Sequence, residues 1–256
     1  MNILKEKLAT GGLVCGTHVS MVDPCLCELL GYLGYDFIWV DMEHSYIGFE
    51  RLMAHLNAAK AAGVACIVRV PVHDLTYTKK VLEMGVDGIV FPMVESAEEA
   101  RTLLDWSLYP PLGNRGFSPM RAVRYGMDSA MEYIEKKSLD LCRFIQIERA
   151  SAVEDLDQIL QLPHIDGYIF GANDLSGSIG ELGHPRGENT DALIRTAVEK
   201  LQAANKPIGI SIGESDSQTL QYWYSRGIRM ISSGTDYAHV FEGAKATLER
   251  MRRLEG

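Results

Sequence analysis

Two carboxylates follow neighbouring apolar segments in the second half of the chain, a pattern that suits a metal site. Gln146 and Glu148 lie at the end of the segment 143–148, and Asp174 follows the segment 166–171. Residues two apart in a strand point to the same face, so Gln146 and Glu148 share one face. Two carboxylates with room for water and substrate oxygens suit a hard cation such as Mg²⁺ or Mn²⁺. The alternative is that Glu148 pairs with an arginine and Asp174 caps a helix.

A histidine and an arginine near the ends of two other segments offer acid–base and charge-stabilising groups. His44 follows the segment 37–43, and Asp41 and Glu43 are close to it in sequence. A carboxylate that accepts a hydrogen bond from an imidazole orients the ring and raises its basicity, so His44 is a candidate general base. Arg69 is flanked by valines in an apolar segment, where an unpaired guanidinium is costly. It therefore needs an anionic partner, either a neighbouring carboxylate or a substrate oxygen.

These residues need a scaffold that brings strand ends together, and the rest of the sequence predicts one. Short apolar, β-branched segments alternate with stretches whose apolar residues recur at helical spacing. The apolar segments span residues 13–19, 37–43, 65–71, 88–94, 143–148, 166–171, 207–213 and 230–236. Such strands, separated by helices, predict a parallel sheet buried on both faces. Eight units and the absence of a GxGxxG motif favour a closed (β/α)8 TIM barrel over an open doubly wound sheet, with one domain over residues 1–256.

Composition and charge exclude several other classes of protein. The chain carries 25 basic and 34 acidic side chains, a net charge of −9, which argues against a nucleic-acid partner. No apolar stretch reaches the roughly 18 residues that a membrane span needs. The first residues lack the basic start and long apolar run of a secretory signal. Because the five cysteines show no CxxC spacing, we expect reduced thiols and a cytoplasmic location.

One long segment, residues 109–127, interrupts the alternation of strands and helices. It contains three prolines, three glycines and three arginines, and it has no acidic residue. A loop of this length in a compact domain is commonly functional or mobile. In an acidic chain, its positive charge suggests a lid that faces an anion. One alternative is a solvated loop whose arginines pair with surface carboxylates. In another, Arg115 holds the turn 113–116 while Arg121 and Arg124 face solvent or a neighbouring subunit.

Five motifs, taken in order, resemble those of one family. They are DMEH (41–44), VRVP (68–71), YPPLGNRGF (109–117), QIE (146–148) and GANDLS (171–176). Over nearly its whole length the chain resembles the HpcH/HpaI aldolase/citrate lyase family, in its pyruvate-type class II branch. The resemblance implies a lyase that reversibly cleaves a 4-hydroxy-2-oxo acid, dicarboxylic acids included, to pyruvate and an aldehyde. It also implies a homohexamer and a divalent cofactor, Mg²⁺ or Mn²⁺, with Co²⁺ as a further candidate.

The resemblance also implies roles for individual residues. Glu148 and Asp174 match the family's metal-binding carboxylates. His44 matches the proposed catalytic base, Asp41 matches the acid that sets this base, and Arg69 matches the arginine that steadies the pyruvate enolate. The implied substrate-binding residues are Gln146, Gly171, Ala172, Asn173 and Arg69.

Two further features of the family map onto this chain. The backbone N–H groups of Asn173 and Asp174 match those that hold the pyruvate carboxylate, at a helix N-terminus that favours anions. A neighbouring subunit lends an acid to the site in this family, and Glu83 lies at the matching position.

The chain departs from the family pattern at several positions. Met42 replaces a usual glycine, the stretch 171–174 replaces the common Gly-Pro-Ala-Asp, and Glu83 replaces an aspartate. His18 stands where a tryptophan is often found, and we leave His18 and His73 as candidate pocket residues. Because none of these changes removes a metal ligand, the base or the arginine, they bear on the substrate more than on the chemistry.

Three other hypotheses remain open. A Schiff-base aldolase would need a lysine inside the barrel, and no lysine falls within the predicted strands. A lyase acting on citryl- or malyl-CoA would need a basic surface for the nucleotide, which only the segment 109–127 offers. A catalytically idle barrel that binds metabolites or serves as a scaffold would not need the complete set of carboxylates, histidine and arginine.

Overall fold

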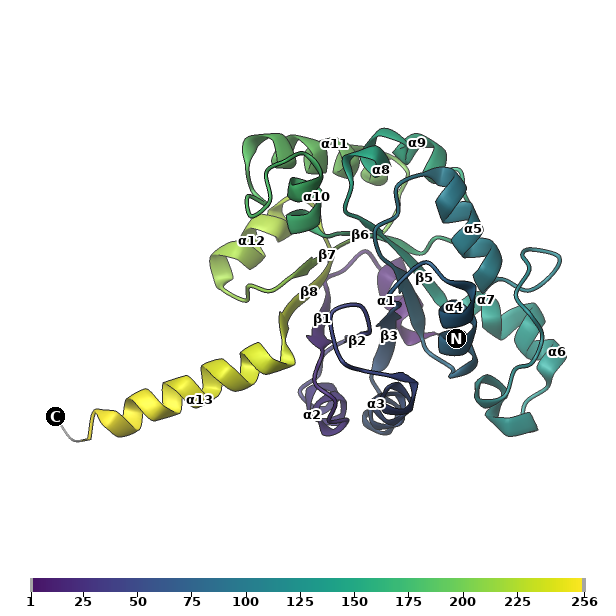
Figure 1. Ribbon diagram of the computed structural model, residues 1–256, viewed down its shortest axis with the longest axis horizontal. Coiled ribbons are helices and arrows are strands. Elements are labelled where there is room, and N and C mark those ends of the chain that lie inside the picture. The colour runs from purple at the N-terminus through teal and green to yellow at the C-terminus, as the bar shows by residue number, and fades with distance from the viewer. Residues whose placement is uncertain (1, 255–256) are drawn as a thin grey trace.

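The computed structural model describes residues 2–254, and its parallel strands close into a barrel in chain order (Figure 1). The last strand pairs with the first, so the barrel has no free edge. The strands are β1 Val14–Val19, β2 Phe37–Asp41, β3 Ala65–Arg69, β4 Gly88–Phe91, β5 Cys142–Ile147, β6 Gly167–Phe170, β7 Ile208–Ile212 and β8 Met230–Thr235. Each coincides with a predicted segment, so the predicted TIM barrel is confirmed.

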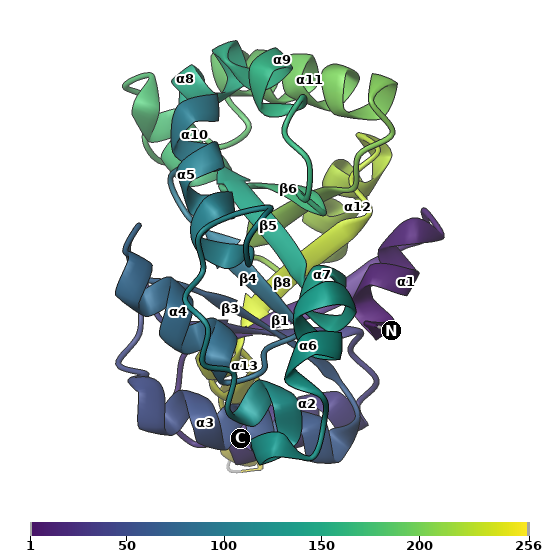
Figure 2. The same ribbon diagram turned by 90° about the vertical axis from the view of Figure 1, so that its right-hand side faces the viewer.

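Most of the helices connect the strands and lie around the outside of the barrel, whereas the first helix precedes β1 and the last helix follows β8 (Figure 2). They are α1 Ile3–Ala9, α2 Cys25–Tyr32, α3 Phe49–Ala62, α4 Leu75–Glu83, α5 Ala97–Ser107, η1 Arg121–Gly126, α6 Ala130–Glu132, η2 Tyr133–Lys137, α7 Ser138–Asp140, α8 Ala150–Glu154, α9 Leu156–Ile159, α10 Ala172–Ser178, α11 Glu188–Ala203, α12 Ser217–Ser225 and α13 Asp236–Arg252. None of the helices within residues 2–254 is long and apolar enough to cross a membrane.

Local signals explain where several helices begin and end. Asp74 and Ser96 cap α4 and α5, because their side chains accept hydrogen bonds from backbone N–H groups of the first turn. Gly63 ends α3 in the left-handed conformation, with φ of 71°, which glycine adopts at little cost. Leu52 and Leu56 lie on the buried face of α3, as their helical spacing predicts.

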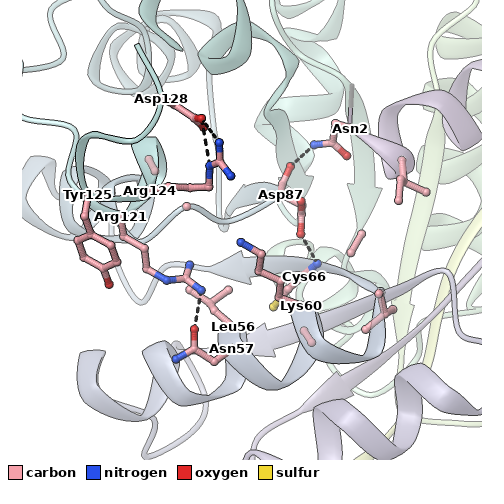
Figure 3. Close-up of a pocket in the computed structure, with 17 residues that line it drawn as sticks. Asn2, Leu56, Asn57, Lys60, Cys66, Asp87, Arg121, Arg124, Tyr125 and Asp128 are labelled. Carbon is pink, nitrogen blue, oxygen red and sulfur yellow. Dashed lines mark hydrogen bonds and ion pairs between the residues drawn. The ribbon is translucent and has the colours of Figure 1, made fainter. Parts of the chain in front are cut away.

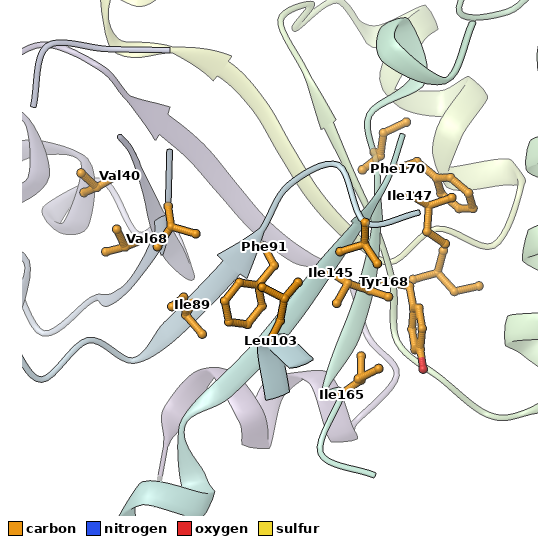
Figure 4. Close-up of a cluster of buried hydrophobic side chains, with 14 of the residues drawn as sticks. Val40, Val68, Ile89, Phe91, Leu103, Ile145, Ile147, Ile165, Tyr168 and Phe170 are labelled. Carbon is orange, nitrogen blue, oxygen red and sulfur yellow. The ribbon is translucent and has the colours of Figure 1, made fainter. Parts of the chain in front are cut away.

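Alternation along the strands divides the apolar side chains between two cores. Phe37, Trp39 and Phe144 point into the barrel, where Leu4 of α1 joins them. Residues on the other face of the strands, such as Ile145, Ile147 and Phe170, pack against the surrounding helices, as with Leu103 of α5 (Figure 4). The barrel interior is therefore filled at its N-terminal end, and inward-facing polar residues are confined to the C-terminal end.

Beyond its first turn, the last helix, α13, is not packed on the barrel. It begins directly after β8, where the Thr235 side chain caps its first turn, and it extends away from the barrel (Figure 1). Every residue from 240 to 254 is exposed. Tyr237, Phe241, Leu248 and Met251 recur at helical spacing, so α13 carries an apolar stripe without a partner in the described chain.

Candidate functional site

A cavity of about 360 Å³ opens at the C-terminal ends of the strands. This is the end at which TIM barrels place their active sites. The cavity is lined by His18, Ser20, Asp41, His44, Arg69, Glu148, Gly171, Ala172, Asn173, Asp174, Ser211, Ile212, Gly213, Thr235 and Tyr237. The structure thus brings nearly all of the site residues predicted from the sequence into one place.

Glu148 is the most deeply buried carboxylate among the residues that line this cavity, with only 2% exposed. Its Oε2 accepts a hydrogen bond of 2.8 Å from the backbone N–H of Met93, and its Oε1 accepts one of 2.8 Å from the side-chain amide of Gln146. Burial raises the pKa of Glu148 to about 7, and the negative charge of Asp174 adds to the rise. Gln146 and Glu148 share the inward face, as their spacing in the sequence predicts.

Gly171 lies against Glu148 so closely that only glycine fits. A Cβ atom at position 171 would lie 2.2 Å from Glu148 Oε1 and 2.7 Å from its Cγ. The backbone that follows β6 therefore forms one side of the Glu148 pocket. The absence of a side chain at 171 is a condition for this carboxylate position.

Asp174 lies on the solvent side of the same cavity. It is the third residue of α10, and both Asn173 and Asp174 are exposed. The helix is capped by Gly171 without a side-chain hydrogen bond, so the alternative prediction that Asp174 caps a helix is not what the structure shows. Neither Glu148 nor Asp174 forms an ion pair among residues 2–254, so neither is paired with an arginine.

The donor set of the cavity fits a hard divalent cation. Within the described chain, no group of three or more His, Cys, Asp or Glu side chains is clustered closely enough to bind a metal alone. Glu148 and Asp174 would supply two carboxylates and leave the other positions to water and substrate oxygens. Mg²⁺ commonly binds proteins in this way, through one or two carboxylates and retained waters.

Arg69 forms the second charged contact of the site. Its Nε and Nη2 donate to the two carboxylate oxygens of Asp41, at 3.0 and 2.6 Å, and its Nη1 lies 3.0 Å from Glu43 Oε2. Nη1 also donates to Gln146 Oε1 at 3.4 Å. Burial alone would raise the pKa of Asp41, but Arg69 holds this pKa below its ordinary value. Neighbouring carboxylates therefore provide the anionic partner that the sequence required for Arg69.

His44 lies at the rim of the cavity, and its contacts differ from those predicted. Its side chain is 69% exposed, and its Nε2 lies 3.7 Å from Glu43 Oε2. Asp41 accepts the backbone N–H of His44 at 3.3 Å, but its carboxylate is engaged by Arg69 rather than by the imidazole. The expectation that Asp41 orients the His44 ring is corrected accordingly, since Glu43 is the acid beside this ring.

Sequence reasoning missed a group of polar side chains on β7 and β8. Ser211 and Ser232 point inward and contact the two ring nitrogens of His18, each at 3.0 Å. The sequence signal for this polar group was a serine at an inward position in each of two apolar strands. This signal is weak, because serine also fills small spaces in packed cores. His18 was left as a candidate pocket residue and does line the cavity, whereas His73 instead contacts Glu99 and the Pro92 carbonyl.

Glu83 lies outside this cavity. It is the last residue of α4, and its Oε1 accepts hydrogen bonds from Arg115 Nη2 at 2.9 Å and from the Tyr109 hydroxyl at 3.4 Å. The guanidinium of Arg115 also stacks on the rings of Tyr109 and Tyr133. Arg115 therefore ties the segment 109–127 to α4.

The other two arginines of the segment 109–127 lie near the N-terminal ends of β3 and β4 (Figure 3). Arg121 donates to the Met84 carbonyl and to Asn57 Oδ1, and Arg124 pairs with Asp128. They line a second pocket, at the opposite end of the barrel from Glu148 and Arg69. The expectation that Arg121 and Arg124 form a lid over this cavity is therefore wrong, because both side chains are held at the other end of the barrel.

The comparison with known proteins identifies the family. The model of the HpcH/HpaI aldolase/citrate lyase family matches residues 15–242. The chain belongs to this family. A 4-hydroxy-2-oxovalerate aldolase of Novosphingobium aromaticivorans is 33% identical over 253 residues, which cover 98% of this chain and 95% of that protein. A 2-dehydro-3,6-dideoxy-6-sulfogluconate aldolase of Pseudomonas putida is 32% identical over 238 residues, which cover 93% and 92%.

The solved structures agree with this assignment. A HpcH/HpaI aldolase/citrate lyase family protein from Burkholderia cenocepacia superposes with a TM-score of 0.92 at 25% identity, covering 98% of this chain and 100% of that one. Membership of the family supports carbon–carbon lyase chemistry, and the relatives at about 30% identity are pyruvate-type aldolases of 4-hydroxy-2-oxo acids. Aldolases of this family are typically of the metal-dependent class II.

The packing of Gly171 against Glu148 gives a first prediction. Gly171→Ala should lower the free energy of unfolding by about 1–3 kcal/mol, because the new Cβ must displace the carboxylate or the backbone. Gly213→Ala is the matched control, since a Cβ there meets nothing within 4 Å in the same cavity. Urea denaturation at a fixed protein concentration measures both changes. Equal unfolding midpoints for the two variants would contradict the close contact.

Proposed function

We propose that this chain, as one barrel domain, is a divalent-metal-dependent aldolase that cleaves a 4-hydroxy-2-oxo acid reversibly to pyruvate and an aldehyde. The observation that carries the proposal is the charge of the cavity. Four carboxylates, those of Asp41, Glu43, Glu148 and Asp174, surround the single guanidinium of Arg69 in the described site. Such an excess of negative charge, with Asp41 and Glu148 buried, favours a bound cation.

Glu148 and Asp174 would hold the cation, with Mg²⁺ or Mn²⁺ as the first candidates and Co²⁺ as a third. A bound cation of this kind supplies Lewis-acid stabilisation to the enolate that forms in the reaction. The chain's own residues then account for orientation and proton transfer. The backbone N–H groups of Asn173 and Asp174, in the first turn of α10, would bind the substrate carboxylate.

His44 and Arg69 would act on the two oxygens whose charge changes. In cleavage, His44 accepts the proton of the 4-hydroxyl group. The C3–C4 bond then breaks, and the electron pair of this bond passes to the pyruvate enolate. The carbon that carried the hydroxyl group becomes the aldehyde. Arg69 donates a hydrogen bond toward the developing enolate oxygen. A proton from solvent then adds to C3 to give pyruvate, and His44 releases the proton that it accepted. Asp41 and Gln146 hold Arg69 in the required orientation.

The alternative of a citryl- or malyl-CoA lyase has less support. Its nucleotide would need a basic surface near the cavity, and Arg115, Arg121 and Arg124 are engaged elsewhere. A binding protein without activity would have no need for both the excess of carboxylates and a histidine at the rim. The decisive experiment is retro-aldol cleavage of a panel of 4-hydroxy-2-oxo acids, with pyruvate release as the readout. The proposal requires release that EDTA abolishes and added Mg²⁺ or Mn²⁺ restores.

We also propose that the protein is a homo-oligomer, a hexamer as the family resemblance implies, in which Glu83 approaches a neighbouring subunit. The support is α13. A recess of about 550 Å³ lies outside β1 and β8, lined in part by Leu13, Leu220 and Tyr224, where the eighth helix of a barrel would pack. No residue separates β8 from α13, and beyond its first turn this helix extends away from its own barrel (Figure 1). The α13 of a second copy would fill the recess.

The metal assignment predicts the behaviour of two variants. Glu148→Ala and Asp174→Ala should each lose Mn²⁺ binding, by a factor of about 10–100 or more, and lose pyruvate release, because each removes one of two protein ligands. Titration followed by Mn²⁺ electron paramagnetic resonance measures binding, and circular dichroism checks the fold. Wild-type activity of either variant in chelated buffer would refute the assignment.

The base assignment predicts a different pattern for His44→Ala. This variant should bind Mn²⁺ as the wild type does, since His44 is not a proposed ligand, while kcat for cleavage falls by roughly 10²–10⁴-fold. Steady-state kinetics separates kcat from KM. If KM alone changed, His44 would be a residue that contacts substrate and not the base.

The oligomer proposal is tested on α13. Phe241→Glu should shift the protein to smaller species in size-exclusion chromatography with light scattering, because it places a charge on the apolar stripe. Arg250→Glu lies on the opposite side of the helix and is the control. A monomeric wild type at micromolar concentration, or identical masses for wild type and Phe241→Glu, would exclude this use of α13.

A further inference from the structure

The cavity has two chemically different walls. The charged side chains Asp41, Arg69, Glu148 and Asp174 come from β2, β3, β5 and the segment after β6. The remaining arc is formed by β7, β8, β1 and the residues that directly follow them, including the first turn of α13. It contributes His18, Ser20, Ser211, Ile212, Gly213, Thr235 and Tyr237. We call this arc the hydroxyl wall. In the part of the chain that the structure describes, it presents hydroxyl groups and no Asp, Glu, Lys or Arg side chain.

His18 organises the hydroxyl wall from behind. Its ring is buried, stacks on Trp39 with 4.7 Å between centroids, and lies 3.0 Å from both Ser211 Oγ, through Nε2, and Ser232 Oγ, through Nδ1. Burial, together with the charge of Arg69, lowers the pKa of His18 to about 4, so the ring is neutral at physiological pH. A neutral imidazole has one donor and one acceptor nitrogen, so one serine donates to the ring and the other accepts from it.

Ser211 is the serine that faces the cavity. It is half-buried and lines the cavity, whereas Ser232 is fully buried behind the ring. A hydroxyl has one donor and two acceptor sites, and the contact with His18 uses only one of them. Whichever way the proton of His18 lies, Ser211 therefore offers a fixed hydrogen-bonding group to a bound molecule.

This arrangement discriminates between kinds of aldehyde. An apolar aldehyde would cover Ser211 and its neighbours without replacing their hydrogen bonds to water, which is unfavourable. A carboxylated aldehyde would bring a second negative charge into a cavity where Arg69 is the one cationic side chain of the described lining. Arg69 already faces Asp41 and Glu43. An uncharged aldehyde with a hydroxyl group avoids both costs.

We infer that the hydroxyl wall binds the aldehyde half of the substrate and selects a short, uncharged aldehyde that carries a hydroxyl group. Ser211 is the specificity-determining residue, and His18 and Ser232 are its positioning residues. The inference rests on the proposed aldolase function, whose 2-oxo acid half occupies the charged wall. It makes the natural substrate a 4-hydroxy-2-oxo acid with at least one further hydroxyl group and no second carboxylate.

The test compares three aldehydes as acceptors for pyruvate in the presence of Mg²⁺. Lactaldehyde and propanal differ by one hydroxyl group on the same three-carbon chain, and succinic semialdehyde carries a carboxylate. In the wild type, kcat/KM should be at least tenfold higher for lactaldehyde than for either of the others. Ser211→Ala should reduce the ratio of lactaldehyde to propanal about tenfold, while Ser211→Thr, which keeps the hydroxyl, should retain most of it.

Two more variants separate positioning from general structural damage. His18→Phe keeps a ring against Trp39 but removes both hydrogen bonds, so it should lower the same ratio as Ser211→Ala does. Ser233→Ala is the control on the neighbouring residue of β8, since Ser233 faces outward and donates to the Glu214 carbonyl. It should leave the ratio unchanged.

The outcomes distinguish this inference from the proposed function. Addition to all three aldehydes with similar kcat/KM, a preference for succinic semialdehyde, or an unchanged ratio in Ser211→Ala would overturn the hydroxyl wall and leave the aldolase in place. The absence of metal-dependent addition to any of the three would overturn the aldolase and the inference with it.

Discussion

A chain of hydrogen bonds between buried charged and polar side chains is the interaction on which the site depends. Asp41 accepts two hydrogen bonds from Arg69, Arg69 donates to Gln146, and Gln146 donates to Glu148, which also accepts the Met93 N–H. These hydrogen bonds link β2, β3, the end of β5 and the segment after β4. Removing Arg69 would leave the buried charge of Asp41 without its partner, at a cost of about 3–5 kcal/mol. The charged wall is therefore rigid before any ligand arrives.

The closed barrel explains why this chain of contacts can exist. Asp41 and Arg69 are paired residues in the register of β2 and β3. Gln146 lies on β5, which is two strands from β3 in the barrel. Apolar layers below them exclude water, so the polar side chains face one opening. The same geometry leaves β7, β8 and β1 to form the opposite wall with uncharged groups. The charged wall of the cavity thus suits a carboxylic acid together with a cation, and the hydroxyl wall suits an alcohol group.

Much of this could be predicted from the sequence, because strand alternation is a local property. The spacing of Gln146 and Glu148 predicted their common inward face, and the eight apolar segments predicted the barrel. Contacts between distant segments could not be read in this way. The carboxylate of Asp41 accepts hydrogen bonds from Arg69, and not from the His44 ring, because of the register between β2 and β3. Likewise, the arginines of the segment 109–127 have their partners on α3, on α4 and beside η1. Ser211 gave little signal, since its role depends on a histidine almost 200 residues away.

The central claim is that Glu148, fixed by this chain of hydrogen bonds, holds the cation needed to form the enolate of pyruvate. The most direct measurement is the exchange of the C3 protons of pyruvate for deuterium in D₂O, followed by proton nuclear magnetic resonance without any aldehyde. The account predicts exchange with Mg²⁺ that stops after EDTA treatment and is lost in Glu148→Gln. Exchange that continues in EDTA, or proceeds at the wild-type rate in Glu148→Gln, would contradict it.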